Sequence, residues 1–349
     1  MTYLIKRLQS QELGSVTAKN PKPSRGRYLF VSKNSSYLEH LPHLSKTILN
    51  DFIILTLVPL YKQHFERCYC TFVYNNDKYH PEIRSGKGQP RDEMRIYSNK
   101  SLENNKLLFK KDDILILKPQ KIQFKDALGN VEEETLYFTY LVQNLHSDLY
   151  KELDNLIKTS PLRGNYAVSD KPIIEVEKSI EVMLKNNDFN SPQGSEESAL
   201  EVTDTITNLS NRSNTSIESL FTHQSIFRDF VQAGYEGRCA ITGQVIRCGN
   251  FNNLQAAHIK PKSHNGQYTP NNGILMNRDM HWAFDTGCFT INDNFTIRVH
   301  PSVESDFLQS LDGKKILIPK QDFFKPDIKN LNYHQEHIYG TFTSRGRVI

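Results

Sequence analysis

The chain has no long hydrophobic segment. Its longest largely apolar stretch, Phe52–Leu60, is nine residues long and contains Pro59, whereas a helix that crosses a membrane needs about 20 apolar residues. The sequence also lacks an opening charged and then apolar leader that ends at a small-residue cleavage site. The first absence excludes a membrane span and the second argues against export, so we expect a cytoplasmic protein.

Cysteine is scarce and is not spaced for zinc. The five cysteines are Cys68, Cys70, Cys239, Cys248 and Cys288, and none of them forms the Cys-x-x-Cys pair that a structural zinc site usually needs. An odd number of cysteines suits a reducing compartment better than a disulfide framework. We therefore expect no structural zinc. Cys239 and Cys248 are interpreted as buried thiols, with a disulfide or a metal site as the alternatives.

Neither charge nor hydrophobicity is extreme. The 349 residues are 38% hydrophobic and 23% charged, with a net charge of +4. This length and composition fit two globular domains that each bury a core. The small excess of cations permits nucleic acid as a partner without requiring it.

Composition divides the chain into three parts. Strand-like stretches dominate the first 158 residues, whereas residues 186–205 contain five acids and no base. Such polar, acidic composition is typical of disordered segments. We predict an α+β protein with a β-rich domain over residues 1–158, a partly disordered linker over 159–215 and a second domain over 216–349. The linker is interpreted as a solubilising spacer, with an acidic tether that mimics phosphate and restrains the two domains in the absence of DNA as the alternative.

One stretch of the second domain, Leu254–Ile291, combines residues that suit hydrolysis. The pattern predicts a short strand ending near His258, a polar loop, an extended piece at Gly273–Met276 and a short helix with His281. His281 and Asp285 are four residues apart, so both project from one helix face. A nitrogen and a carboxylate oxygen placed in this way can hold a divalent cation. A histidine across a hairpin can activate water beside that cation.

Each of these residues also has a simpler interpretation. A lone histidine is usually a surface or core residue, and the Asn272-Gly pair is normally only a turn. A His–Asp pair at helical spacing is often only an ion pair. Their occurrence together, in this order, favours a functional site.

The ordered elements Ala-His258-Ile, Asn272-Gly-Ile-Leu and His281-x-x-Phe-Asp285-x-Gly resemble the HNH (ββα-metal) nucleases. The resemblance covers roughly Ser216 to the C-terminus and implies hydrolysis of nucleic-acid phosphodiester bonds with one metal ion. It implies that His258 is the general base, that Asn272 orients the loop holding it, and that His281 is a metal ligand. Asp285 is the expected second ligand. Mg²⁺ is the favoured ion, and Mn²⁺ fits a mixed nitrogen and oxygen ligand set equally well.

The chain departs from this family at Ala257, where many members carry an aspartate or histidine ligand directly before the base. The metal would then rely on His281, Asp285, water and the scissile phosphate. The segment Tyr235–Gly243 is predicted to turn into a strand that pairs with Asn253–Ile259 as the nuclease hairpin.

The first domain carries two groups of residues suited to DNA. Residues 1–33 contain seven cations against one acid, and their Gly-, Ser- and Pro-containing loop is interpreted as a phosphate-contacting arm or as a solvated loop. Arg91, Glu93 and Arg95 alternate onto one face of a predicted strand. Arginine can bridge a guanine edge and glutamate can accept from cytosine N4, although such a face is often only the solvent side.

The opening Tyr3-Leu-Ile-Lys-Arg-Leu, the later Gly26-Arg-Tyr-Leu-Phe-Val and the Arg91-Asp-Glu-Met94-Arg-Ile element resemble the N-terminal DNA-recognition domain of EcoRII, over about residues 1–158. This resemblance implies a β-pseudobarrel that clamps the major groove of duplex DNA with two arms. Met94 replaces a basic residue of that family, so the bases read need not be the same. The implied DNA contacts are Lys19, Lys22 and Arg25 in one arm and Arg84, Lys87, Arg91, Glu93 and Arg95 in the other.

The two resemblances together imply a site-specific, type II restriction-like endonuclease acting on double-stranded DNA. One such site cuts one strand, so we expect a homodimer, with two sequential nicks as the alternative route to a double-strand break. A restriction role also predicts a cognate methyltransferase gene. Two other functions stay open: a modification-dependent HNH endonuclease, and a DNA-binding regulator whose nuclease domain is inactive.

Overall fold

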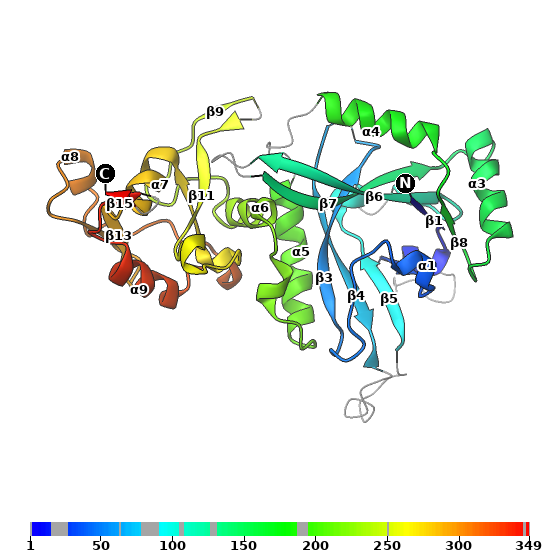
Figure 1. Ribbon diagram of the computed structural model, residues 1–349, viewed down its shortest axis with the longest axis horizontal. Coiled ribbons are helices and arrows are strands. Elements are labelled where there is room, and N and C mark those ends of the chain that lie inside the picture. The colour runs from blue at the N-terminus through cyan, green and yellow to red at the C-terminus, as the bar shows by residue number, and fades with distance from the viewer. Residues whose placement is uncertain are drawn as a thin grey trace. The chain divides into compact units, whose positions relative to one another are not determined.

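The chain folds as two compact units. A computed structural model describes residues 2–14, 27–62, 64–77, 91–104, 108–125, 131–186, 195–249, 251–344 and 347–348. Unit 1 is Met1–Leu220 and unit 2 is Phe221–Ile349; in Figure 1 they run from blue to green and from yellow-green to red. Both units combine helices with strands, so the protein has the predicted α+β class.

Unit 1 is built on one eight-stranded sheet. The strand order is β2-β5-β4-β3-β7-β6-β1-β8, and neighbours are antiparallel except for the parallel pair of β3 and β7. The strands are β1 (Tyr3–Arg7), β2 (Tyr28–Val31), β3 (Phe52–Pro59), β4 (Cys68–Asn75), β5 (Glu93–Tyr97), β6 (Ile114–Lys125), β7 (Val131–Val142) and β8 (Tyr166–Ser169).

A shared core joins strands from the two ends of this sheet. Leu29 of β2 and Ile96 of β5 belong to the same buried cluster as Leu4 of β1 and Leu117 of β6. These strands are far apart in the strand order, so the sheet must curl around a common interior (Figure 1). Burying each large apolar side chain contributes about 1.5–3 kcal/mol, which stabilises the curled form.

Helices cover this sheet in two places. Ile157 of α3, together with Val176 and Ile180 of α4, packs in a second cluster with residues of β1, β6 and β7. Helix α5 packs instead against β4 and α2. The helical elements of unit 1 are η1 (Ser10–Leu13), α1 (Ser35–Leu38), α2 (Lys100–Glu103), α3 (Asp148–Thr159), α4 (Ile174–Asn186), α5 (Ser195–Ser210) and η4 (Ile217–Leu220).

The segment 159–215, predicted as a partly disordered linker, contains regular secondary structure in the part that the structure describes. It contributes β8, α4 and α5 to unit 1. Ile206 and Leu209 of α5 are buried, and the hydroxyl of the buried Ser198 accepts a hydrogen bond from the backbone N–H of Tyr69 at 2.6 Å. The polar composition concealed this helix because most of its few apolar residues are buried on one face, and Leu200 is the exposed exception.

Replacing Ile206 with alanine is expected to destabilise unit 1 by about 2–4 kcal/mol, the usual effect of truncating a buried aliphatic side chain. Hydrogen exchange at the Tyr69 amide should accelerate, because α5 covers that part of β4. Leu200→Ala is the matched control, since Leu200 lies on the same helix but is 36% exposed. Equal and small effects of both substitutions would support a free spacer instead.

Unit 2 surrounds its own core with short elements. Phe227, Ile274, Phe284 and Phe289 are completely buried in that core. The elements are α6 (Gln224–Gly234), β9 (Arg247–Cys248), β10 (Phe251–Asn252), β11 (Leu254–His258), η5 (Lys262–His264), η6 (Pro270–Asn272), β12 (Gly273–Asn277), α7 (Arg278–Asp285), β13 (Phe289–Ile291), β14 (Ile297–Val299), α8 (Asp306–Gln309), η7 (Asp322–Phe324), α9 (Ile328–His337), β15 (Thr343–Ser344) and β16 (Arg347–Val348).

The hairpin next to α7 has a different partner from the one predicted. β11 pairs antiparallel with β12, which follows it in the chain. The segment Tyr235–Gly243 forms turns rather than a strand, and the Ala240 amide donates a 2.7 Å hydrogen bond to the Leu275 carbonyl of this hairpin. The apolar residues of Tyr235–Gly243 are buried in the core of unit 2, although their backbone is not extended. Because buried strands have a similar apolar composition, the sequence suggested a strand here.

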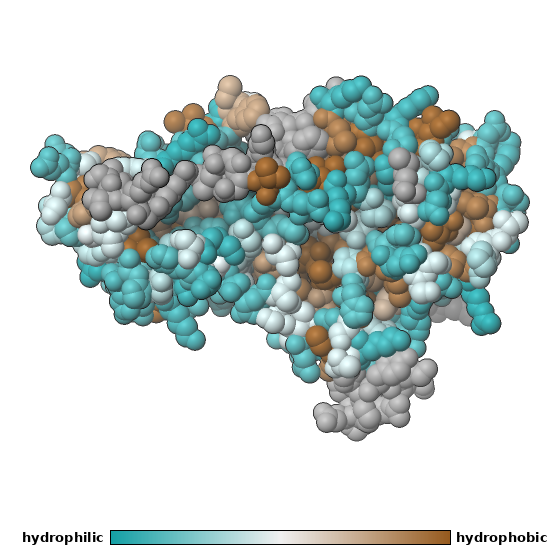
Figure 2. Space-filling model, viewed as in Figure 1, coloured by the Kyte–Doolittle hydropathy of each residue, from teal (hydrophilic) through white to brown (hydrophobic). Residues whose placement is uncertain are grey.

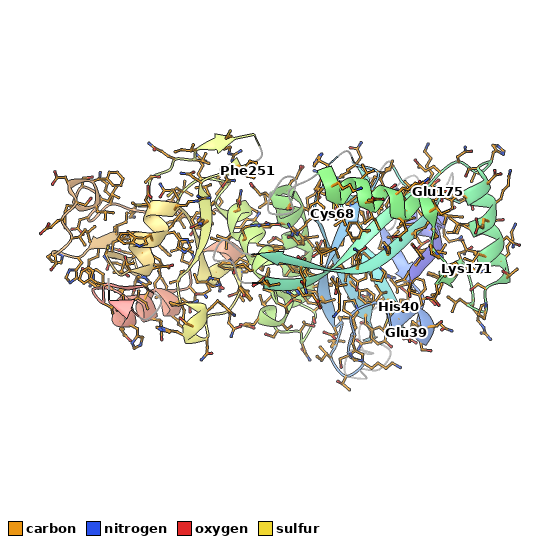
Figure 3. All side chains as sticks on the ribbon, turned by 45° about the horizontal axis from the view of Figure 1, so that its top comes forward. Glu39, His40, Cys68, Lys171, Glu175 and Phe251 are labelled. Atoms are coloured by element: carbon orange, nitrogen blue, oxygen red, sulfur yellow. The ribbon has the colours of Figure 1, made fainter. Side chains whose placement is uncertain are left out.

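The surface of the molecule is mostly polar in the view of Figure 2, where hydrophobic residues form small groups among hydrophilic ones. Phe251 on β10, labelled in Figure 3, is one of the exposed large apolar residues of unit 2, at 61% exposure. Among the described residues, no helix combines the length and the apolar character needed to cross a membrane.

Candidate functional site

The hairpin and the following helix of unit 2 bring the predicted residues into one small motif. His258 ends β11 opposite Gly273, the first residue of β12. Helix α7 begins at Arg278, directly after β12 ends at Asn277. The Asn277 side chain caps the helix by accepting a hydrogen bond from the Met280 backbone N–H at 2.9 Å. The sequence Gly273–Asp285 therefore turns from strand to helix without a loop, which fixes His281 relative to the hairpin.

Aromatic rings hold the imidazole of His258. It stacks on Phe227 of α6, with ring centroids 4.2 Å apart and an interplanar angle of 18°, and Tyr268 lies at 5.5 Å from it. A Cβ atom on the opposing Gly273 would lie 2.3 Å from Val231 and 2.8 Å from Phe227. Glycine at this position is thus what allows α6 to approach the hairpin and reach the histidine.

Burial and charge together keep the His258 ring neutral. Desolvation is the largest cause and the nearby Lys262 ammonium the second; they outweigh the opposing effect of Asp285 and lower the pKa of His258 from 6.5 to about 3. His281 also acts on this ring, in the same direction as Lys262. Within the described residues, the buried Nε2 of His258 has no hydrogen-bond partner. At neutral pH the His258 imidazole is therefore neutral.

We expect NMR titration to show His258 still neutral at about pH 5, where an ordinary histidine is protonated. The folded-state pKa is lower than the unfolded value, so acid favours unfolding between about pH 6.5 and pH 3, by up to about 1.4 kcal/mol per pH unit. The stability is complete above this window and is lost as the pH falls through it. His334, whose burial lowers its pKa to about 4, contributes in the same direction.

The His258→Phe variant is the control for this acid sensitivity. Thermal unfolding of unit 2 between about pH 7 and pH 5 should depend less on pH in the variant, with the contribution of His334 remaining. A resonance of His258 that titrates near pH 6.5 would contradict the assignment of a buried, neutral ring.

Asn272 organises the loop between the two strands. It is 1% exposed, and its side-chain oxygen accepts a hydrogen bond from the Lys260 N–H at 2.9 Å. Its amide group donates to the carbonyl oxygens of Lys260 at 3.1 Å and Gln267 at 2.8 Å, and its own carbonyl accepts from the Ile259 N–H at 2.9 Å. These bonds fix the chain just after His258.

His281 and Asp285 lie on the same face of α7. His281 Nε2 is 3.2 Å from an Asp285 carboxylate oxygen, and His281 Nδ1 is 2.8 Å from the side-chain oxygen of Gln255 on β11. The His281 side chain is 22% exposed and that of Asp285 is 51% exposed. Both side chains are therefore partly exposed to solvent, and His281 contacts the hairpin that carries His258 through Gln255.

Comparison with protein families identifies a match over the segment that carries His258, His281 and Asp285. Residues 239–292 match the HNH endonuclease family. The matched segment contains the hairpin, the loop and α7. It supports a nuclease activity for unit 2 and leaves unit 1 unassigned.

Other comparisons add less. The solved structure of a modification-dependent TagI restriction endonuclease is similar to part of the chain, with 20% identity, a TM-score of 0.26 and coverage of 34% of this chain. The match spans 39% of that enzyme. No curated protein matches the sequence.

The donor atoms of His281 and Asp285 suit a hydrated cation. Two neighbouring ligands in an octahedral shell at about 2.1 Å from the ion are about 3 Å apart, close to the 3.2 Å between His281 Nε2 and Asp285. Across the part of the chain that the structure describes, no group of three or more His, Cys, Asp or Glu residues is placed to hold a metal. Mg²⁺ usually keeps several waters and takes few protein ligands, so this pair fits Mg²⁺ or Mn²⁺.

Sequence reasoning missed several residues that contact the two histidines or act on them. Phe227 and Gln255 contact the two histidines but lie outside the motif, so only the packing of α6 and the strand register reveals them. Lys262 lies with its ammonium 3.9 Å from the Tyr268 ring centroid. The Lys260-Pro-Lys262 sequence after Ile259 indicates positive charge next to His258, and it could have identified Lys262.

The residues predicted to read DNA bases have partners within unit 1. Arg91 precedes β5 and pairs with Asp77 at 2.8 Å, whereas Glu93 and Arg95 lie on β5 and pair with each other. The Arg95 guanidinium lies 4.1 Å from the Tyr28 ring centroid, on the neighbouring strand. The remaining predicted contacts fall outside the described residues: Lys19, Lys22, Arg25, Arg84 and Lys87.

Proposed function

We propose that unit 2 hydrolyses phosphodiester bonds in double-stranded DNA as a metal-dependent HNH endonuclease. The observation that carries this proposal is the buried Nε2 of His258, which has no hydrogen-bond partner among the described residues. His281 and Asp285 lie close enough to His258 to influence its pKa. A neutral imidazole with a free lone pair can take the proton of a water that attacks phosphorus in line.

The residues of the site have complementary roles in this mechanism. His258 accepts the proton, with its ring held by Phe227, and Asn272 maintains the loop that follows. His281 and Asp285 would hold the divalent ion, which when bound polarises the phosphate and stabilises the leaving oxyanion. The phosphate charge would offset that of Lys262 and so raise the basicity of His258 when DNA binds.

Unit 1 is proposed to recognise the DNA site, in the manner of a pseudobarrel with two arms. The curled eight-stranded sheet supports this role, and so does the arginine next to the aromatic rings of β2. Arg91 and Arg95 would exchange their carboxylate partners, Asp77 and Glu93, for base edges. The complete enzyme would then be a type II restriction-like nuclease that cuts both strands as a homodimer, beside a cognate methyltransferase.

Incubation of plasmid DNA with the full chain tests the proposed hydrolysis. Discrete fragments are expected with Mg²⁺ or Mn²⁺, and EDTA should abolish them. DNA that is retarded in a gel but stays uncut with either ion would instead identify a binding regulator, the alternative that Ala257 favours. Fragments obtained only from methylated plasmid would identify a modification-dependent nuclease.

Arg91→Ala is expected to weaken binding of the specific site by about 1–3 kcal/mol, because a bidentate contact to a base would be lost. Binding of unrelated duplexes should change much less. Lys111→Ala is the control, since Lys111 is an exposed cation of the same unit. Equal losses on specific and unrelated DNA would assign Arg91 to the phosphate backbone and contradict base reading.

A further inference from the structure

Gln255 connects the hairpin to the metal-binding face of α7. In β11, Gln255 and Ala257 point to one side and Ala256 and His258 to the other, because side chains alternate along a strand. Gln255 reaches across to His281, with its Oε1 2.8 Å from Nδ1. An amide oxygen only accepts hydrogen bonds, so Nδ1 must carry the hydrogen in this contact.

This contact determines which atom of His281 is available. A neutral imidazole protonated at Nδ1 has its lone pair at Nε2, the atom that lies 3.2 Å from the Asp285 carboxylate. A lone pair and a carboxylate that face each other are both electron-rich, so the contact is favourable only when a positive charge lies at the pair, either a second proton on His281 or a bound cation. A divalent cation that binds Nε2 and Asp285 would take the place of that proton.

We infer that Gln255 is a positioning residue that fixes the Nδ1–H tautomer of His281 and thereby directs Nε2 to the metal. This inference rests on the proposed metal-dependent function of unit 2. Groups that bond the second nitrogen of a ligating histidine fix its tautomer and orientation. The effect is large here because, among the described residues, the site offers only His281 and Asp285 as protein ligands.

Substitutions of Gln255 that preserve shape separate this role from simple packing. Gln255→Met keeps the length of the side chain and removes the acceptor, whereas Gln255→Glu keeps an oxygen that accepts from Nδ1–H. Gln244→Met is the matched control, because Gln244 is exposed in the same unit. Melting temperatures of all three variants establish that each is folded.

Two measurements are informative besides DNA cleavage. Nitrogen chemical shifts of His281 in metal-free protein at about pH 9, where histidine is neutral, report the tautomer. Titration with Mn²⁺, followed by electron paramagnetic resonance, reports the affinity for the ion. We expect Gln255→Met to populate the Nε2–H tautomer and to bind Mn²⁺ about 10–100-fold more weakly. Gln255→Glu should restore both properties, and Gln244→Met should change neither.

An unchanged tautomer and unchanged Mn²⁺ affinity in folded Gln255→Met would overturn the inference while leaving the nuclease proposal intact. Wild-type protein that neither binds Mn²⁺ nor cuts DNA would instead overturn the proposed function. The tautomer measurement requires no metal, so it distinguishes the two failures.

Discussion

Replacement of His258 by phenylalanine is expected to lower the rate of DNA cleavage by about 10²–10⁴-fold, the usual contribution of a general base. The phenyl ring preserves stacking on Phe227 and removes Nε2, which has no hydrogen bond to lose. Removal of a buried, unsatisfied polar atom is neutral or stabilising, so the melting temperature of unit 2 should not fall. The cleavage rate under single-turnover conditions and thermal unfolding measure the two effects.

DNA binding separates a loss of chemistry from a loss of the substrate site. The affinity of His258→Phe for uncut DNA should equal that of the wild type in EDTA, because His258 acts on water. His258→Ala should also be inactive, but it loses the stacked ring and should therefore be less stable. His337→Ala, which alters an exposed histidine of α9, should cut normally. Substantial cleavage by both His258 variants would assign the base to another residue.

Local geometry explains which parts of the site were predictable. His281 and Asp285 share a face through helical spacing alone, and Asn272 acts on the loop within its own motif. Gln255 and Phe227 were not predictable, because their contacts depend on strand register and on how closely α6 approaches. The chemical groups of the motif could therefore be predicted from the sequence, whereas the residues that orient them could be identified only from the folded structure.

The fold was predictable to a smaller extent, for the same reason. Strand-like stretches located the β-rich domain in the first 158 residues, but nothing local indicates that β3 pairs in parallel with β7 across many residues. Ser198 illustrates the difficulty in α5: a serine predicts polarity and exposure, yet it is buried and bonded to a strand amide. Such a side chain can be interpreted only after its partner is known.

Replacement of His281 by alanine is expected to reduce cleavage by about 10³-fold at fixed Mg²⁺, because several kcal/mol of charge stabilisation depend on the bound ion. Asp285→Asn should have a smaller effect, since an amide oxygen can still coordinate without its charge. Unlike the loss of His258, this loss should be partly reversible. Higher Mn²⁺ concentrations refill a weakened site by mass action but cannot replace a missing base.

The dependence of rate on Mn²⁺ concentration therefore distinguishes the two histidines. The rate of His281→Ala should rise over a concentration range in which the wild type is already saturated, and that of His258→Phe should stay flat. Asp279→Asn is the control, because it removes an exposed carboxylate from the first turn of the same helix. If His281→Ala saturated at the wild-type Mn²⁺ concentration, the ion would be bound elsewhere. The His281–Asp285 contact would then be only an ion pair between neighbouring turns of α7.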